Sequence, residues 1–177
     1  MTFRFTGIKV LAAAAAGAAL ALAAPIPAKP APPTLGQWLV GQRYVAIPLQ
    51  RLPTAHQLVR VAINGRPALF VLDSGAAGTV IDSNQLDRFG IGGSVLNGTG
   101  VGAGGAIRVS LHNVATFSIG GHRIPLGKIV STDLTGVIAG FGKVPDGSIS
   151  GVVGQDVLTR FGGVIDVKGN ALYLKIP

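Results

Sequence analysis

The chain has 177 residues, a length that fits one domain, and its 15 basic residues outnumber 7 acidic ones, all Asp, giving a net charge of +8. The 27 glycines and the low charged content of 12% argue against a helical bundle or coiled coil, and 48% hydrophobic residues argue against disorder. The absence of cysteine excludes disulfides, thiolate zinc sites and thiol nucleophiles.

The N-terminus has the pattern of an export signal. Arg4 and Lys9 supply a positive start, an uncharged run of small and apolar residues follows, and Ala21 and Ala23 fit a cleavage site after Ala23. A membrane anchor is the alternative, but the apolar run is short for a span of ~20 residues and ends at prolines. We therefore predict a signal peptide over residues 1–23 and an exported protein, either periplasmic or secreted.

Residues 24–43 are rich in Pro and Ala and are predicted to form a linker, extended as far as Gly36, with a short turn over residues 38–43. Basic residues are scattered along the chain and do not cluster with aromatic ones, so no nucleic-acid partner is expected. A membrane is expected as a partner only through the signal segment, if that segment is not cleaved.

From residue 44 onward the pattern is one of short strands and tight turns, so residues 44–177 are predicted to form one mostly-β domain. The apolar runs 58–63 and 68–72 flank Asn64-Gly65, a strong signal for a two-residue hairpin, and the second run is predicted to be buried. Helices are expected only over residues 83–89 and 155–161, and a long loop over residues 131–147. Further strands are expected over residues 44–49, 106–111, 115–119, 123–125, 128–130, 164–167 and 171–176.

Several familiar site patterns are absent. His56, His112 and His122 stand apart and are expected on the surface or in turns, so no metal ion and no cofactor is predicted. No Ser lies in a G-x-S-x-G elbow, which excludes that kind of hydrolase site. Residues 100–105 match G-x-G-x-x-G, but a strand-like run follows them where dinucleotide binding needs a helix. A Gly-rich hairpin is the better interpretation of this segment.

Asp73-Ser74-Gly75-Ala76 directly follows the buried run 68–72. A carboxylate at that place loses solvation unless polar groups hold it. Gly75 allows a tight turn in which backbone N–H groups face the carboxylate. An ordinary turn at the end of a strand explains this short motif equally well when it is considered alone.

The wider context of the motif favours a functional interpretation. Residues 70–76, Phe-Val-Leu-Asp-Ser-Gly-Ala, and the later Val152-Val153-Gly154 before a helix together resemble the retropepsin-like aspartic proteases. That family has two apolar residues before Asp-Thr/Ser-Gly-Ala, and later two apolar residues and Gly. The resemblance covers residues 44–176, and within the family the chain is most similar to the exported bacterial members with a single lobe.

The resemblance implies a closed, barrel-like β fold with two short helices. It implies that Asp73 is catalytic, that Ser74 holds the loop through its hydroxyl, and that residues 98–107 form a flap over the substrate. The residues implied to support the loop are Ser74, Gly75, Ala76, Val152, Val153 and Gly154, and the flap glycines are Gly98, Gly100, Gly102, Gly104 and Gly105.

Peptide hydrolysis of this kind needs two carboxylates that share one proton, one acting as a base on water while the other polarises the scissile carbonyl. The chain has one Asp-Ser-Gly and is too short for two lobes, so the second Asp73 has to come from a twofold-related subunit. We therefore predict an aspartic endopeptidase that acts as a homodimer on peptide or protein substrates. The alternative is a non-catalytic module of the same fold that binds peptides or envelope partners. A plain structural β module explains the composition but not the paired motifs.

The chain departs from the retroviral members of the family at two places. Those members carry acids just after the Ala of the first motif, where this chain has Ala77 and Gly78, and an Arg after the Gly of the second motif, where it has Gln155. Both partners of that ion pair are missing together, so no buried charge is left unpaired. The retroviral manner of gripping substrate and bracing the dimer is therefore not expected here.

The other acids are expected to have structural or solvent-facing positions. Asp146 lacks the preceding buried strand and the following hydroxyl residue, so it is not expected to replace the second Asp73. The remaining acids are predicted to cap helices (Asp82, Asp156), to be structural (Asp166) or to lie in solvent (Asp87, Asp133).

Overall fold

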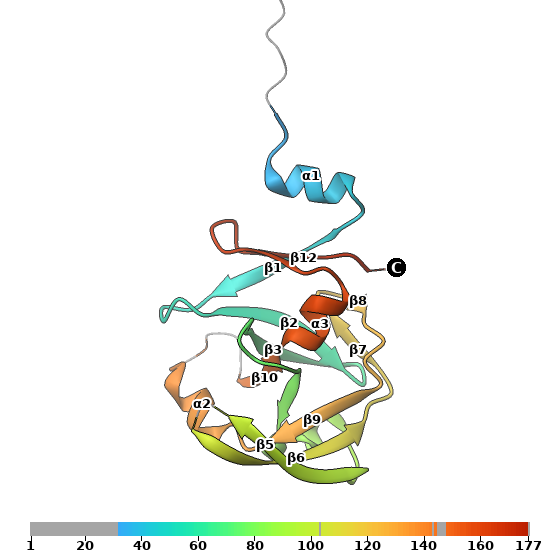
Figure 1. Ribbon diagram of the computed structural model, residues 1–177, viewed down its shortest axis with the longest axis vertical. Helices are drawn as coiled ribbons and strands as arrows, with labels where there is room; N and C mark the ends of the chain where they lie inside the picture. The colour runs from blue at the N-terminus through green and yellow to red at the C-terminus, as the bar shows by residue number, and fades with distance from the viewer. Residues whose placement is uncertain (1–31, 103, 143, 145–147, 177) are drawn as a thin grey trace, which may run out of the picture. The chain divides into compact units, whose positions relative to one another are not determined.

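The computed structural model describes residues 32–102, 104–142, 144 and 148–176 (Figure 1). The expected signal peptide, residues 24–31 of the expected linker and Asp146 lie outside the described residues. Residues 33–177 form one compact unit. Within the described residues, no helix is long and apolar enough to cross a membrane.

The described residues are mostly β, as the sequence predicts. The strands are Val45–Arg51 (β1), Gln57–Ile63 (β2), Arg66–Leu72 (β3), Val80–Asp82 (β4), Leu96–Gly102 (β5), Gly105–Asn113 (β6), Phe117–Ile119 (β7), His122–Arg123 (β8), Lys128–Thr132 (β9), Ile149–Val153 (β10), Val164–Asp166 (β11) and Ala171–Leu174 (β12). The helices are Leu35–Gly41 (α1), Thr135–Gly140 (α2) and Gln155–Arg160 (α3), with 3-10 helices at Ser83–Gln85 (η1) and Asp87–Phe89 (η2).

The strands hydrogen-bond in the order β11-β12-β1-β2-β3-β10-β4-β9-β6-β5, and β7 pairs with β2 and β8. Most neighbours are antiparallel, but β3 pairs in parallel with β10, and β4 with β9. Figure 1 shows β1 with β12 towards one end of the sheet and β5 with β6 at the other. No pairing among the described strands joins β11 to β5, so the closed barrel remains a prediction.

The β2–β3 hairpin has the turn that its sequence predicts. Asn64 and Gly65 have φ values of 49° and 77°, the left-handed backbone that a two-residue turn of this type requires. The Asn64 side chain accepts hydrogen bonds from the N–H groups of Ala115 (2.9 Å) and Thr116 (3.1 Å), and it donates to the Phe89 carbonyl at 3.0 Å. The hairpin is thereby tied to two later segments of the chain.

β3 is buried on both faces, as predicted. Phe70 is fully buried in the main core, together with Ile81 of β4 and Val153 of β10. Leu69 and Val71, on the opposite face of β3, belong to a second, smaller core cluster. Because apolar side chains of β3, β4 and β10 pack together in this core, the loop that leaves the end of β3 starts from a well-packed base.

Two of the expected local structures differ from those observed. Helix α1 occupies residues 35–41, so the turn predicted over residues 38–43 is confined to residues 42–43, and the linker predicted to be extended as far as Gly36 enters the helix at Leu35. A capping box starts this helix: the Thr34 hydroxyl accepts from the Gln37 N–H, and the Gln37 side chain accepts from the Thr34 N–H. The loop predicted over residues 131–147 contains the end of β9 and the short helix α2. Before α2, hydrogen bonds from Thr135 lower the pKa of Asp133.

The predicted helix over residues 83–89 forms two 3-10 helices, η1 and η2, while the one over residues 155–161 is confirmed as α3. The expected cap and end are present: the Asp82 carboxylate accepts from the Asn84 N–H at 3.3 Å, and Gly90 has a φ of 60°. The segment is short, and tight 3-10 turns are common in such short pieces.

Candidate active site

Asp73 lies just beyond the end of β3, and its carboxylate is held by its own loop. The Gly75 N–H donates to Asp73 Oδ1 at 2.8 Å, and the Ala76 N–H donates to the Asp73 carbonyl at 3.2 Å. The N–H of Asp73 itself donates to the Val153 carbonyl at 3.1 Å. Asp73, Ser74 and Gly75 are exposed in the single chain. The carboxylate is therefore oriented by its loop yet open to an approaching group.

The parallel pairing of β3 with β10 brings the second motif beside the first. Val152 aligns with Val71, and Val153 with Leu72, so the end of β10 lies next to Asp73. On its other edge β10 pairs with β4, which follows the Asp73 loop in the chain. The Asp73 loop thus connects β3 to β4, the two strands that flank β10, and Val153 and Gly154 lie between its two ends.

Gly154 occupies a place where only glycine fits. A Cβ atom built on it lies 2.5 Å from the Gly78 carbonyl oxygen and 2.7 Å from that of Ala76. Both are backbone atoms of the Asp73 loop, so they cannot move aside as a flexible side chain can. The close contact lets the Gln155 N–H reach the Ala76 carbonyl at 2.9 Å. The loop and the start of α3 are therefore joined through their backbones.

Thr79 and Asp156 add a polar link that the sequence interpretation missed. The hydroxyl of Thr79, which is buried, donates to Asp156 Oδ1 at 2.7 Å and accepts from the Gly154 N–H at 3.3 Å. The same Asp156 oxygen accepts from the Val157 N–H at 2.8 Å, in agreement with its expected place at a helix start. A hydroxyl residue after the first motif and an acid after the second are the only sequence signals for this link.

Gln155 contacts the loop through its side chain as well. Its Nε2 donates to the Ser74 carbonyl at 2.7 Å, and its Oε1 accepts from the Thr159 hydroxyl at 2.9 Å. The Ser74 hydroxyl makes no hydrogen bond to another residue in the described part of the chain. Ser74 is thus held through its carbonyl, and the expected role of its hydroxyl is not seen within one chain.

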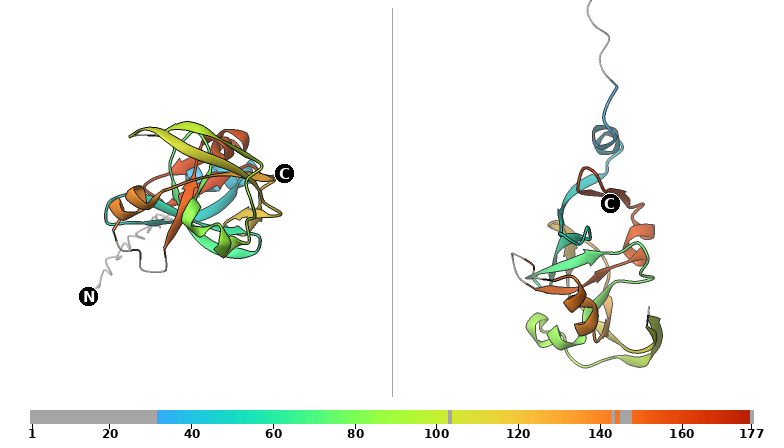
Figure 2. Two further views of the ribbon diagram at one scale, coloured as in Figure 1. Left: turned by 90° about the horizontal axis from the view of Figure 1, so that it is seen from below. Right: turned by 90° about the vertical axis from the view of Figure 1, so that its left-hand side faces the viewer.

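The glycine-rich segment forms the β5–β6 hairpin, which lies along the upper edge of the left view in Figure 2 (yellow-green). Gly98, Gly100 and Gly102 alternate along β5, and the side chains of Val109 and Ile107 lie across them. A Cβ atom on Gly100 lies 3.2 Å from Val109 Cγ1, and one on Gly102 lies 3.3 Å from Ile107 Cγ2. Glycine here makes room for the branched side chains of the facing strand.

Gly104 lies in the turn of this hairpin, and Gly105, the first residue of β6, has a φ of 110°, which favours glycine. Val101, near this turn, is 90% exposed. A cavity of about 430 Å³ lies against β6 and β9, and its lining includes Arg108, Asp133 and hydroxyl groups of both strands. The hairpin is joined to the Asp73 loop through the sheet order β6-β9-β4-β10.

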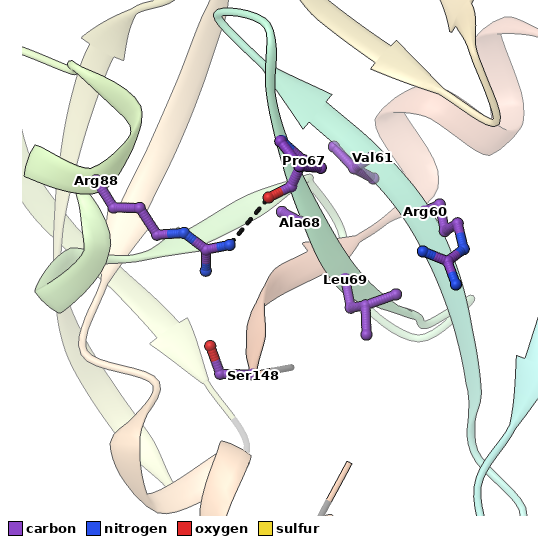
Figure 3. Close-up of a pocket in the computed structure, with 7 residues that line it drawn as sticks. All are labelled: Arg60, Val61, Pro67, Ala68, Leu69, Arg88 and Ser148. Atoms are coloured by element: carbon purple, nitrogen blue, oxygen red, sulfur yellow. Dashed lines mark hydrogen bonds between the residues drawn. The ribbon is translucent and has the colours of Figure 1, made fainter. Parts of the chain in front are cut away.

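A second cavity, of about 200 Å³, lies beside the start of β3 (Figure 3). Arg60 and Arg88 flank it, and the Arg88 guanidinium donates to the Pro67 carbonyl at 3.0 Å and to the Ser150 hydroxyl at 3.3 Å. Through these hydrogen bonds, Arg88 connects η2 to β3 and β10. No residue of the Asp73 loop lines this cavity, so it is separate from the candidate active site.

His112 does not lie on the surface or in a turn, where the sequence interpretation puts it. Its side chain is buried on β6, because both ring nitrogens find partners: Nδ1 is 3.0 Å from the Gly92 carbonyl and Nε2 is 2.9 Å from the Ser131 hydroxyl. His56 is exposed and packs edge-on against Phe141. In the described residues, no three His, Cys, Asp or Glu side chains gather where they could hold a metal ion.

Comparison with known proteins finds similarity to aspartic proteases, both in sequence and in structure. A family model described as "Aspartyl protease" matches residues 59–157, more than half of the chain, and this span includes both motifs. The structure is similar to that of a retropepsin-like aspartic protease from Rickettsia conorii, with 18% identity and a TM-score of 0.51 over 74% of this chain and 98% of that one. A second similar structure is EIAV protease complexed with the inhibitor HBY-793, with 21% identity and a TM-score of 0.48 over 63% of this chain and 92% of that one. No curated protein sequence matches the chain.

Proposed function

The chain belongs to the aspartyl protease family and has a retropepsin-like fold, and we propose that it is an endopeptidase in which two subunits each supply one Asp73. The observation that supports this most is a carboxylate at the exposed end of a buried strand, with one oxygen held by the Gly75 N–H at 2.8 Å. A second copy of the loop can approach such a carboxylate about a twofold axis.

The other acids support the need for a second subunit, since none of those described shares a hydrogen bond with Asp73. The backbone carbonyl of Asp87 accepts a hydrogen bond from the side chain of Arg66, at the opposite end of β3 from Asp73. The rise of an extended strand separates Arg66 from Asp73 by about 20 Å. The remaining described acids accept hydrogen bonds from nearby backbone N–H groups: Asp82 from Asn84, Asp133 from Thr135, Asp156 from Val157 and Asp166 from Gly169.

In the proposed reaction the two Asp73 carboxylates share one proton. The ionised one takes a proton from a water molecule, whose oxygen adds to the scissile carbonyl carbon while the protonated one donates to the carbonyl oxygen. The tetrahedral intermediate then collapses: the leaving nitrogen takes the proton that the first carboxylate removed from water, the C–N bond breaks, and the other carboxylate takes a proton from a hydroxyl of the intermediate, which restores the starting pair. Because the two carboxylates share one proton, the active form belongs to the dimer and not to one residue.

Two further elements belong to this proposal. The β5–β6 hairpin acts as a flap that closes over an extended peptide, which the exposed Val101 near its turn supports. The mature protein acts in the periplasm or after secretion, which the N-terminal pattern supports and N-terminal sequencing of the mature protein tests.

The direct test is to incubate the mature protein with a diverse peptide library from acid to neutral pH, at several protein concentrations. We expect cleavage within peptides, and we expect the rate per chain to rise with concentration as dimers form. Cleavage that is absent at concentrations where the chain is dimeric would contradict the proposal and favour the non-catalytic peptide-binding alternative.

A further inference from the structure

We propose that Gln155 is a positioning residue that fixes the orientation of the Asp73 carboxylate. The inference rests on the proposed function, because it gives Gln155 a role in that same site. Gln155 occupies the position at which retroviral members of the family carry an Arg, so in this chain a neutral amide contacts the Asp73 loop from that position.

Gln155 acts on the peptide group that holds Asp73. The carbonyl of Ser74 and the N–H of Gly75 belong to one planar peptide unit and point in opposite directions. The Gln155 amide donates to that carbonyl at 2.7 Å, while the N–H on the other side of the same unit donates to Asp73 Oδ1 at 2.8 Å. Fixing the carbonyl therefore fixes the direction of the N–H that orients the carboxylate.

The backbone of Gln155 holds the peptide unit between Ala76 and Ala77, two units further along the loop. Its N–H donates to the Ala76 carbonyl at 2.9 Å, so Gln155 contacts carbonyls on both sides of Gly75. Glycine is the residue with the widest choice of backbone angles, and the two contacts limit that freedom by holding the chain before and after Gly75.

The amide of Gln155 is itself oriented. The Thr159 hydroxyl, four residues later on α3, donates to Gln155 Oε1 at 2.9 Å. A hydroxyl that donates to one end of the amide leaves the Nε2 end to face Ser74. A series of hydrogen bonds thus leads from helix α3 to the carboxylate, through Thr159, Gln155, the Ser74–Gly75 peptide unit and Asp73.

The variant Gln155→Glu tests this role through the pH profile. A protonated Glu can still donate to the Ser74 carbonyl, whereas an ionised Glu cannot and repels it. We expect kcat/KM of the variant to equal that of the parent at the acid end and to fall about ten-fold below it as pH rises past about 4–5. Taking the ratio to the parent at each pH removes the pH dependence that the two proteins share, and saturating protein concentrations keep both dimeric. Gln42→Glu adds the same charge at an exposed site at the end of α1, and its ratio should stay flat. A flat ratio for Gln155→Glu as well would overturn the proposal.

A second measurement does not depend on activity. In Gln155→Ala, we expect the Gly75 amide hydrogen to exchange with solvent about ten-fold faster than in the parent, while core amides such as that of Phe70 are unchanged. Unchanged exchange at Gly75 would contradict the positioning role of Gln155 even if the protein proves to be a protease. If the parent cleaves no peptide and the exchange at Gly75 still becomes faster in the variant, the proposed function fails. The contacts of Gln155 then remain as a structural feature of the loop.

Discussion

Replacing Asp73 with Asn is expected to lower kcat/KM for peptide cleavage by at least about 1,000-fold and to leave the fold intact. Asn has the size of Asp, and its Oδ1 can still accept the hydrogen bond from the Gly75 N–H. It can neither take a proton from water nor share one with the partner carboxylate. Because Asp73 is exposed in the single chain, the loss of its charge removes no buried ion pair. Steady-state kinetics and thermal unfolding of the variant measure the two halves of this expectation.

Asp87→Asn is the matched control for that change. Asp87 is also an exposed acid, but it lies at the opposite end of β3 in η2, so its neutralisation should leave cleavage within about two-fold of the parent. Cleavage that survives in Asp73→Asn would remove Asp73 from the reaction, and equal losses in both variants would point to charge or dimerisation instead of chemistry.

Replacing Gly154 with Ala is expected to lower the free energy of unfolding by about 3 kcal/mol. The new Cβ would lie 2.5 Å from the carbonyl oxygen of Gly78 and 2.7 Å from that of Ala76, and only a shift of the loop backbone can relieve both contacts. That shift also strains the hydrogen bond from the Gly154 N–H to the Thr79 hydroxyl. Denaturant unfolding at a fixed protein concentration measures the change, and cleavage should fall with it.

Gly78→Ala is the control within the same loop. A Cβ on Gly78 meets no atom within 4 Å, so this variant should unfold within about 0.5 kcal/mol of the parent. If the two alanine variants prove equally stable, Gly154 does not pack beneath the Asp73 loop in the way described.

The sequence predicts those features that a short local pattern determines. Asn64 and Gly65 form the expected turn because both residue types favour the left-handed backbone that the turn requires, so the dipeptide itself is sufficient to predict it. The burial of β3 and the cap at Asp82 follow in the same way from neighbouring residues. The strand after residues 100–105 is also local, and it removes the dinucleotide interpretation of that glycine motif.

Features that depend on contacts between distant segments are not predicted in this way. The hydrogen bond between Gln155 and Ser74 joins residues that lie 81 positions apart, and the one between Thr79 and Asp156 spans 77. His112 is buried because Gly92 and Ser131, on two other segments, satisfy its ring. Such partners come together only after the sheet has formed, so local residue patterns carry little information about them.

The most direct test of a site shared between two chains is to co-express the parent and the Asp73→Asn chain in equal amounts and to measure cleavage per total protein. If each active site needs one Asp73 from each subunit, random pairing leaves about one quarter of the parental activity, because only dimers of two parent chains are complete. Retention of about one half would mean that each chain carries a complete site of its own, and it would contradict the shared carboxylate pair.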